Sequence, residues 1–178
     1  MRYLINLLVD QSRKNHSPLV RGVATLLGGT LFLAVFPVFV LWAGRVFGCC
    51  FILPVFFARI VSVFCLVMGA PWLLSSIFWQ LSRGKGTPVP VIPTKHFLSN
   101  GPYLYVRNPM MLGFFLYLLG WVFKGNTIGA LAAGILIIAL LVMFMKFVEE
   151  PELEARFGSS YLEYKRNTPF ILPKFPKK

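Results

Sequence analysis

Long uncharged stretches separated by short basic segments set the pattern of this chain. Three of them, residues 22–43, 60–81 and 125–145, contain no charged side chain. Each is long enough to cross the hydrocarbon core of a bilayer, which takes about 20 helical residues. A fourth, residues 109–123, has 15 residues and would give only about 22 Å of helix. The pattern predicts an all-α integral-membrane bundle of four transmembrane helices.

The segments between these stretches contain helix-breaking residues. Residues 46–58 are interrupted by Pro54 and are expected to form a re-entrant or interfacial segment. Residues 83–107 contain four prolines, and a loop of this length without secondary structure usually has a function. The short stretch 109–123 follows this loop, so we expect its helix to begin below the membrane surface. Irregular backbone at that depth is tolerated only where protein or a watery cavity surrounds it, which indicates a site.

A short amphipathic helix is predicted near the C-terminus. Pro151 suits the first turn of a helix, and Ser160 with Glu163 matches a capping box. Tyr161 and Tyr164 would then press on the membrane or on the bundle.

Composition and charge agree with a membrane protein. Apolar residues make up 57% of the chain and charged residues 13%, whereas about a quarter of a soluble domain is charged. The chain has 18 lysines and arginines against 6 acids. In so apolar a chain this excess suits an anionic membrane surface rather than a nucleic acid.

The basic residues fall mostly on one side of the predicted bundle. Fifteen of them lie before the first stretch, in the middle loop or after the last stretch, while Arg45 and Lys124 lie on the other side. Arg59 is expected at the outer interface, and the alternative is a functional charge within the membrane. By the positive-inside rule, both termini and the middle loop are predicted to be cytoplasmic.

Neither a metal site nor a cleaved leader is expected. Cys49, Cys50 and Cys65 lie in or beside apolar runs and lack the spacing of a metal site or a disulfide framework. The N-terminal segment lacks the cleavage site of a signal peptide.

Two clusters of residues could carry chemistry. Five of the six acids lie between positions 149 and 163, and Glu149 and Glu150 would close the last span, where carboxylates oppose the helix dipole. These acids either pair with neighbouring cations at the interface or bind a cationic ligand. The second cluster, residues 101–113, contains Arg107 and Asn108. Asn108 before Pro109 suits a helix N-cap, so this segment fits either a plain helix start or a binding loop.

Two blocks of the chain resemble the isoprenylcysteine carboxyl methyltransferase and phospholipid methyltransferase superfamily. They read GKGTPVPVIPTKHFLSNGPYLYVRNPMMLG and EEPELEARFGSSYLEYKR. The resemblance implies an integral-membrane enzyme that uses S-adenosylmethionine, with catalytic roles for Arg107, Asn108 and Glu150. The residues implied in cofactor binding are Tyr103, Tyr105, Val106, Arg107, Asn108, Pro109, Gly113, Glu149 and Glu150. Within this single domain, 1–178, residues 1–82 would form two spans, 83–108 a cytoplasmic loop, and 109–166 the cofactor-binding hairpin and tail.

The chemistry of this methyl donor agrees with these residues. Its ammonium would form a charge-assisted hydrogen bond with Glu149 or Glu150. Its sulfonium suits an aromatic face such as Tyr103 or Tyr105, and Arg107 would take its carboxylate. Methyl transfer is an in-line displacement that depends on alignment and desolvation and needs no metal.

The methyl acceptor is expected to be lipidic or amphiphilic, because the spans are apolar. Phosphatidylethanolamine, a prenylated or other lipidic acid, and a small amphiphile all remain open. An amine acceptor would need a base, for which Glu150 suits better than His96, whereas His16 is expected to be solvated. We also expect residues 84–102 to fold over the bound cofactor.

Two other functions fit parts of the pattern. One is an NADPH-dependent membrane reductase related to the sterol reductases, although those chains generally carry more spans. The other is a non-catalytic membrane scaffold, which would explain neither the paired acids nor the Asn-Pro helix start.

Overall fold

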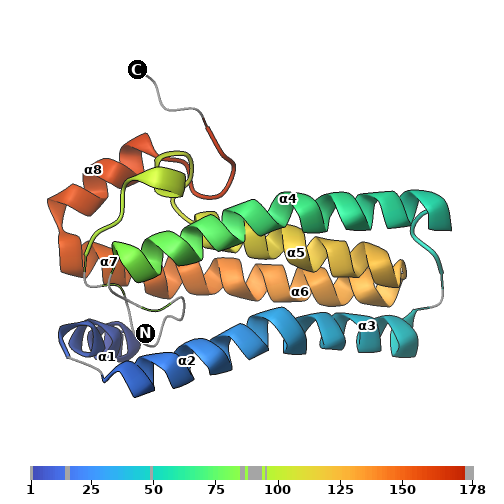
Figure 1. Ribbon diagram of the computed structural model, residues 1–178, viewed down its shortest axis with the longest axis horizontal. Coiled ribbons are helices and arrows are strands. Elements are labelled where there is room, and N and C mark those ends of the chain that lie inside the picture. Colours follow the sequence, from blue (N-terminus) through green and yellow to red (C-terminus); the bar gives the residue numbers. More distant parts are fainter. Residues whose placement is uncertain are drawn as a thin grey trace.

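A computed structural model shows an all-α protein (Figure 1). It describes residues 2–14, 17–48, 50–84, 87, 94 and 96–174, and these residues form no β-strand. The α-helices are α1 (Arg2–Arg13), α2 (Pro18–Thr30), α3 (Phe36–Phe47), α4 (Val55–Ser82), α5 (Pro109–Gly125), α6 (Ile128–Phe144), α7 (Glu150–Phe157) and α8 (Ser159–Asn167). Two π-helical turns, η1 (Leu31–Val35) and η3 (Met145–Glu149), and one 3₁₀ turn, η2 (Gly101–Leu104), complete the described elements.

Among the described residues, three continuous helices are long and apolar enough to cross a membrane. They are Leu19–Phe47, Val55–Ser82 and Ile128–Phe157, and the apolar helix Pro109–Gly125 is shorter, with 17 residues. The all-α membrane bundle predicted from the hydrophobic pattern is therefore confirmed. That the short helix also crosses the membrane stays a prediction.

The π-helical turns keep two of these long helices continuous past a proline. Pro37 follows η1 and Pro151 follows η3. Proline cannot donate to the helix ladder and its ring clashes with the carbonyl four residues earlier, while a π-turn changes the local hydrogen-bond register. Glu149 and Glu150 consequently do not close a helix, because α7 continues to Phe157. The predicted conflict with a helix C-terminus is wrong.

Two other local predictions fail in part or in full. Residues 46–58 do not form a re-entrant segment, because α3 continues to Phe47 and α4 already begins at Val55, just after Pro54. That the connection lies at the membrane interface stays a prediction. The short connection between them is held by Asn126, whose side chain accepts from the Leu53 N–H at 3.1 Å and donates to the Leu53 carbonyl at 2.8 Å. A long-range contact fixes this connection, and the local sequence does not show it.

The capping box does not form in the C-terminal helix. Helix α8 begins at Ser159, with Gly158 at the N-cap and no side-chain cap bond. Gly158 has φ +56°, a conformation that glycine adopts readily, and it turns the chain sharply between α7 and α8. As expected, Tyr161 is buried, at 2% exposure.

Helices α4 and α5 are packed unusually close by small residues. A Cβ atom on Gly113 would lie 2.5 Å from the Leu73 backbone nitrogen. Further along α5, the Ser62 hydroxyl donates to the Gly120 carbonyl at 2.7 Å. Small residues and interhelical hydrogen bonds are how helices associate in membranes. Gly113 therefore has a packing role in the fold.

The long helices run side by side, and α1, α7 and α8 gather at one end of them (Figure 1). Large apolar side chains on the outer faces, such as Leu26, Phe64 and Leu140, are more than half exposed. Such a surface suits contact with lipid. Helix α1 and the segment that follows α8, at the two described ends of the chain, lie toward the same end of the bundle as α7 (Figure 1).

Candidate functional site

Arg107 and Asn108 join the start of α5 to the C-terminal tail. Arg107 Nη1 donates to the carbonyls of Lys165 at 2.6 Å and Thr168 at 3.0 Å. Asn108 lies at the predicted N-cap position of α5 but makes no side-chain cap bond. Its Nδ2 donates instead to the Phe170 carbonyl at 3.1 Å. Both side chains thus position the C-terminal tail beside the N-terminal end of α5.

Glu150 is the anionic centre of a small ion-pair network. Its carboxylate lies 2.8 Å from Arg107 Nη2 and 2.8 Å from Lys165 Nζ. Lys165 also pairs with Glu154 at 2.6 Å, and the hydrogen bonds to both carboxylates raise the pKa of Lys165. The Arg107 and Glu150 side chains are only 12% and 8% exposed. The network therefore fixes α7 and α8 against the start of α5.

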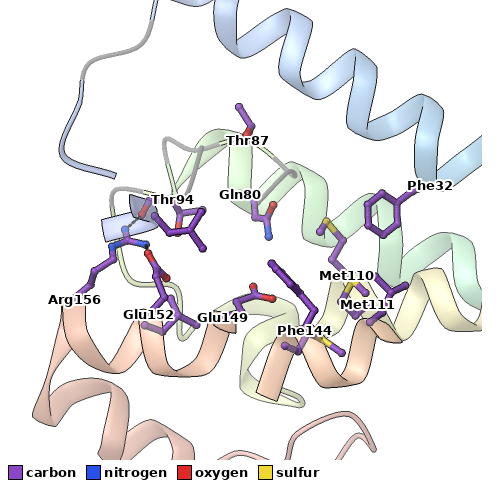
Figure 2. Close-up of a pocket in the computed structure, with 14 residues that line it drawn as sticks. Phe32, Gln80, Thr87, Thr94, Met110, Met111, Phe144, Glu149, Glu152 and Arg156 are labelled. Carbon is purple, nitrogen blue, oxygen red and sulfur yellow. Dashed lines mark hydrogen bonds and ion pairs between the residues drawn. The ribbon is translucent and has the colours of Figure 1, made fainter. Parts of the chain in front are cut away.

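Glu149 faces a cavity. About 760 Å³ of empty space, part of it open to solvent, lies between α4, α5 and the η3–α7 segment. Figure 2 shows Glu149 and Gln80 pointing into this space, with Phe144 and Met110 beside them. Within the described part of the chain, the Glu149 carboxylate has neither a hydrogen bond nor an ion pair.

A second cavity of about 600 Å³ adjoins the first. The two share the lining residues Gln80, Thr94, Met110, Met111, Glu149 and Leu153. The second is also lined by Tyr103, Arg107, Asn108, Pro109, Tyr161 and Tyr164. The structure thus brings five predicted site residues to one place: Tyr103, Arg107, Asn108, Pro109 and Glu149.

Four predicted site residues line neither of these two cavities. Val106 is fully buried, Gly113 packs on α4, and Glu150 is held by its two cations. Tyr105 is 37% exposed and lies edge-to-face with Trp72, with ring centroids 6.4 Å apart. Of the predicted loop over the cofactor, 84–102, residues 85, 86, 88–93 and 95 lie outside the described residues, as does His16. His96 is exposed and lines neither cavity.

Buried tyrosines form part of the second cavity's wall. The Tyr103 hydroxyl accepts from Gln80 Nε2 at 2.9 Å, and the Tyr164 hydroxyl donates to the Tyr103 carbonyl at 2.7 Å. Burial raises the pKa of Tyr103, of Tyr164 and of Tyr161. All three hydroxyls therefore stay neutral at physiological pH.

Several residues at the cavities were not predicted from the sequence. Gln80 had a signal, since it is the one amide in the stretch 60–81. Arg156 pairs with Glu152 at 2.7 Å and donates to the Thr94 carbonyl, which holds Thr94 at the cavity. Thr94 and Thr87 lie in a proline-rich loop and had no distinguishing signal.

An apolar groove joins the first cavity. About 540 Å³ of space lies between the α2–η1 segment, α4 and α5. It shares Phe32, Met110 and Met111 with the first cavity. The other groove residues are Thr25, Gly28, Gly29, Leu33, Leu73, Ile77 and Phe114. The apolar groove and the cavity that Glu149 lines therefore share part of their walls.

The sequence profile of the phospholipid methyltransferase family matches residues 57–160. The chain belongs to this family. The match covers nearly all of α4 and the whole of α5, α6 and α7. It therefore includes Gln80, Asn108, Glu149 and Glu150. The predicted resemblance to membrane methyltransferases is confirmed.

Two curated relatives match this phospholipid methyltransferase family member over segments shorter than the family match. Methanethiol S-methyltransferase 2 of Bradyrhizobium diazoefficiens is 37% identical over 75 residues, or 41% of this chain and 28% of the relative. Protein-S-isoprenylcysteine O-methyltransferase of Schizosaccharomyces pombe is 33% identical over 82 residues, or 44% of this chain and 34% of the relative. The aligned segments therefore cover about a third of each relative or less. No solved structure matches the chain significantly.

Proposed function

We propose that the protein transfers a methyl group from S-adenosylmethionine to a lipid-soluble acceptor at the membrane surface. The observation that carries this proposal is that two different spaces lie side by side and share part of their walls. One is a cavity with an unpaired carboxylate and an aromatic wall, and the other is an apolar groove between helices. Phe32, Met110 and Met111 line both.

The residues at the cavities fit the methyl donor. Glu149 has no partner in the described part of the chain, so its carboxylate is free to accept a charge-assisted hydrogen bond from an ammonium. Tyr103, Tyr161 and Tyr164 offer ring faces to a sulfonium. When bound, S-adenosylmethionine supplies an activated methyl group. The protein would hold it in line with the acceptor and exclude water.

Arg107 and Glu150 act differently in this proposal from the roles implied by the resemblance. Each neutralises the other at 2.8 Å, and Arg107 also binds two tail carbonyls. We therefore assign the ammonium to Glu149 rather than to Glu150. Arg107, Asn108 and Glu150 position the wall of the site.

The groove suits the apolar part of the acceptor. An aliphatic or prenyl chain lying between α2 and α4 would bury apolar surface and bring its polar head to the cavity beside Met110. A lipid acid, a lipid amine or a smaller amphiphile would all fit this arrangement. In each case the groove supplies affinity for the tail, and the cavity aligns the reacting atom.

A matched pair of glycine variants tests the groove. Gly29 lines it, and a side chain there would meet nothing within 4 Å. Gly29→Leu would fill the groove and should lower kcat/KM for a long-chain acceptor about tenfold, or about 1.4 kcal/mol. Gly22→Leu on the same helix also meets nothing within 4 Å but lies outside the groove, so it should retain activity.

The measurement is transfer of radiolabelled methyl groups to a set of lipid acceptors by detergent-purified protein. A parallel titration compares binding of S-adenosylmethionine and NADPH. Binding of S-adenosylmethionine, equal in both glycine variants, is the expected result. Binding of NADPH alone would favour a reductase, and binding of neither would favour a scaffold; both would contradict the proposal.

A further inference from the structure

Gln80 lines both cavities and carries a buried, unpaired acceptor. It lies in the last turn of α4. Its Nε2 donates to the Tyr103 hydroxyl at 2.9 Å. Its Oε1 is buried and has no hydrogen-bond partner among the described residues. Buried polar atoms in native proteins are nearly always paired, so a donor from outside the chain is expected here.

Glu149, which lines the same two cavities as Gln80, also lacks a hydrogen-bond donor within the described part of the chain. Figure 2 shows the two side chains entering one space from α4 and from η3. The nearby cations Arg156 and Lys165 are engaged by Glu152, and by Glu150 and Glu154, respectively. Two acceptors, one of them a carboxylate, would be satisfied together by a cation with at least two N–H groups.

We propose that Gln80 Oε1 and the Glu149 carboxylate together hold the primary ammonium group of a bound ligand. Neutral hydroxyl or amide ligands would satisfy Gln80 but would leave the carboxylate without a counter-charge. This inference rests on the proposed function, in which two molecules can carry such a group. They are the methyl donor, through its amino-acid end, and an acceptor lipid with an amine head.

Two substitutions distinguish the contribution of the acceptor oxygen to ligand binding from that of the hydrogen bond to Tyr103. Gln80→Met removes both the oxygen and the N–H donor with little change in volume. Gln80→Glu keeps acceptor oxygens but removes the donor to Tyr103. Gln80→Met should weaken binding of ammonium ligands about tenfold or more, as for a hydrogen bond to a charged group. Gln80→Glu should bind them at least as tightly as the wild type.

The ligands are chosen in pairs that differ in the ammonium. S-adenosylhomocysteine carries it and methylthioadenosine lacks the whole amino-acid end; phosphatidylethanolamine has N–H groups and phosphatidylcholine has none. Binding to the full chain in detergent is measured by calorimetry. A Gln80→Met loss confined to S-adenosylhomocysteine assigns the ammonium to the donor, and one confined to phosphatidylethanolamine assigns it to the acceptor. Unchanged methylthioadenosine binding also shows that the variant is folded.

Three results overturn the inference while the proposed function stands. They are equal binding of the ammonium ligands by wild type and Gln80→Met, equal losses for S-adenosylhomocysteine and methylthioadenosine, or a loss in Gln80→Glu as large as in Gln80→Met. The last would mean that Gln80 acts through Tyr103. If the wild type binds none of the four ligands, the proposed function fails and this inference fails with it.

Discussion

At the scale of single residues, the two adjacent acids of the chain have different surroundings. The Glu150 carboxylate contacts Arg107 and Lys165, whereas the Glu149 carboxylate points into a cavity. Neighbouring residues on a helix point about 100° apart, so they cannot share one role. Replacing each acid with glutamine should therefore have a different effect: one on ligand affinity, the other on stability.

Glu149→Gln should weaken S-adenosylmethionine binding without destabilising the fold. The loss of one charged hydrogen bond costs about 1.5–3 kcal/mol, or about ten- to a hundredfold in affinity. Titration calorimetry measures the affinity, and thermal melting in detergent measures the stability. Normal donor binding by Glu149→Gln would contradict the assignment of the ammonium to this residue.

Glu150→Gln should mainly destabilise the protein. It leaves the nearly buried Arg107 side chain, 12% exposed, without its counter-charge, and breaking one side of a buried ion pair typically costs about 3–5 kcal/mol. A drop in melting temperature in the absence of any ligand is the expected result. If Glu150→Gln melts like the wild type but loses donor affinity, Glu150 rather than Glu149 binds the ammonium.

At the scale of elements, the packing of α4 against α5 places Gln80 opposite Asn108 and Glu149. Gly113→Ala should disturb this packing, because the new Cβ would lie 2.5 Å from the Leu73 backbone nitrogen. Overpacking of this kind costs about 1–3 kcal/mol. Gly22→Ala, whose Cβ meets nothing within 4 Å, is the control. Thermal melting decides between this role and the predicted cofactor contact, for which Gly113→Ala would lose donor affinity at unchanged stability.

At the scale of the whole molecule, one end of the bundle collects the basic segments. Helices α1, α7 and α8 lie there with the end of α4 (Figure 1), while Arg45 and Lys124 lie near the ends of α3 and α5 at the opposite end. By the positive-inside rule, the end with α1, α7 and α8 should be cytoplasmic. The proposed site would then face the cytoplasm.

Reporter fusions test this orientation. A reporter that works only outside the cytoplasm should be silent when fused after Lys174 and active when fused after Ile52, in the connection between α3 and α4. A reporter that works only in the cytoplasm should give the opposite pattern. An active external reporter after Lys174 would contradict the predicted orientation and the cytoplasmic site.

The sequence by itself determined the class of the molecule and its family. Uncharged stretches fix the apolar helices, because burying a charge in hydrocarbon is costly at any position. Two short blocks carry the family resemblance, and they contain the five predicted site residues that the structure brings to the cavities. These features depend on local composition and spacing, which a linear sequence shows directly.

Only the tertiary structure decided which side chains face the cavity. The phase of a helix after a π-turn sets the direction of Glu149 and Glu150, and this phase depends on how η3 passes Pro151. Gln80 is distant from Glu149 in sequence, and the packing of α4 on α5 and of α5 on α6 brings both to the same cavities. The same holds for the connection fixed by Asn126 and for the apolar groove. Such contacts are set by packing between distant elements, and no local pattern in the sequence determines them.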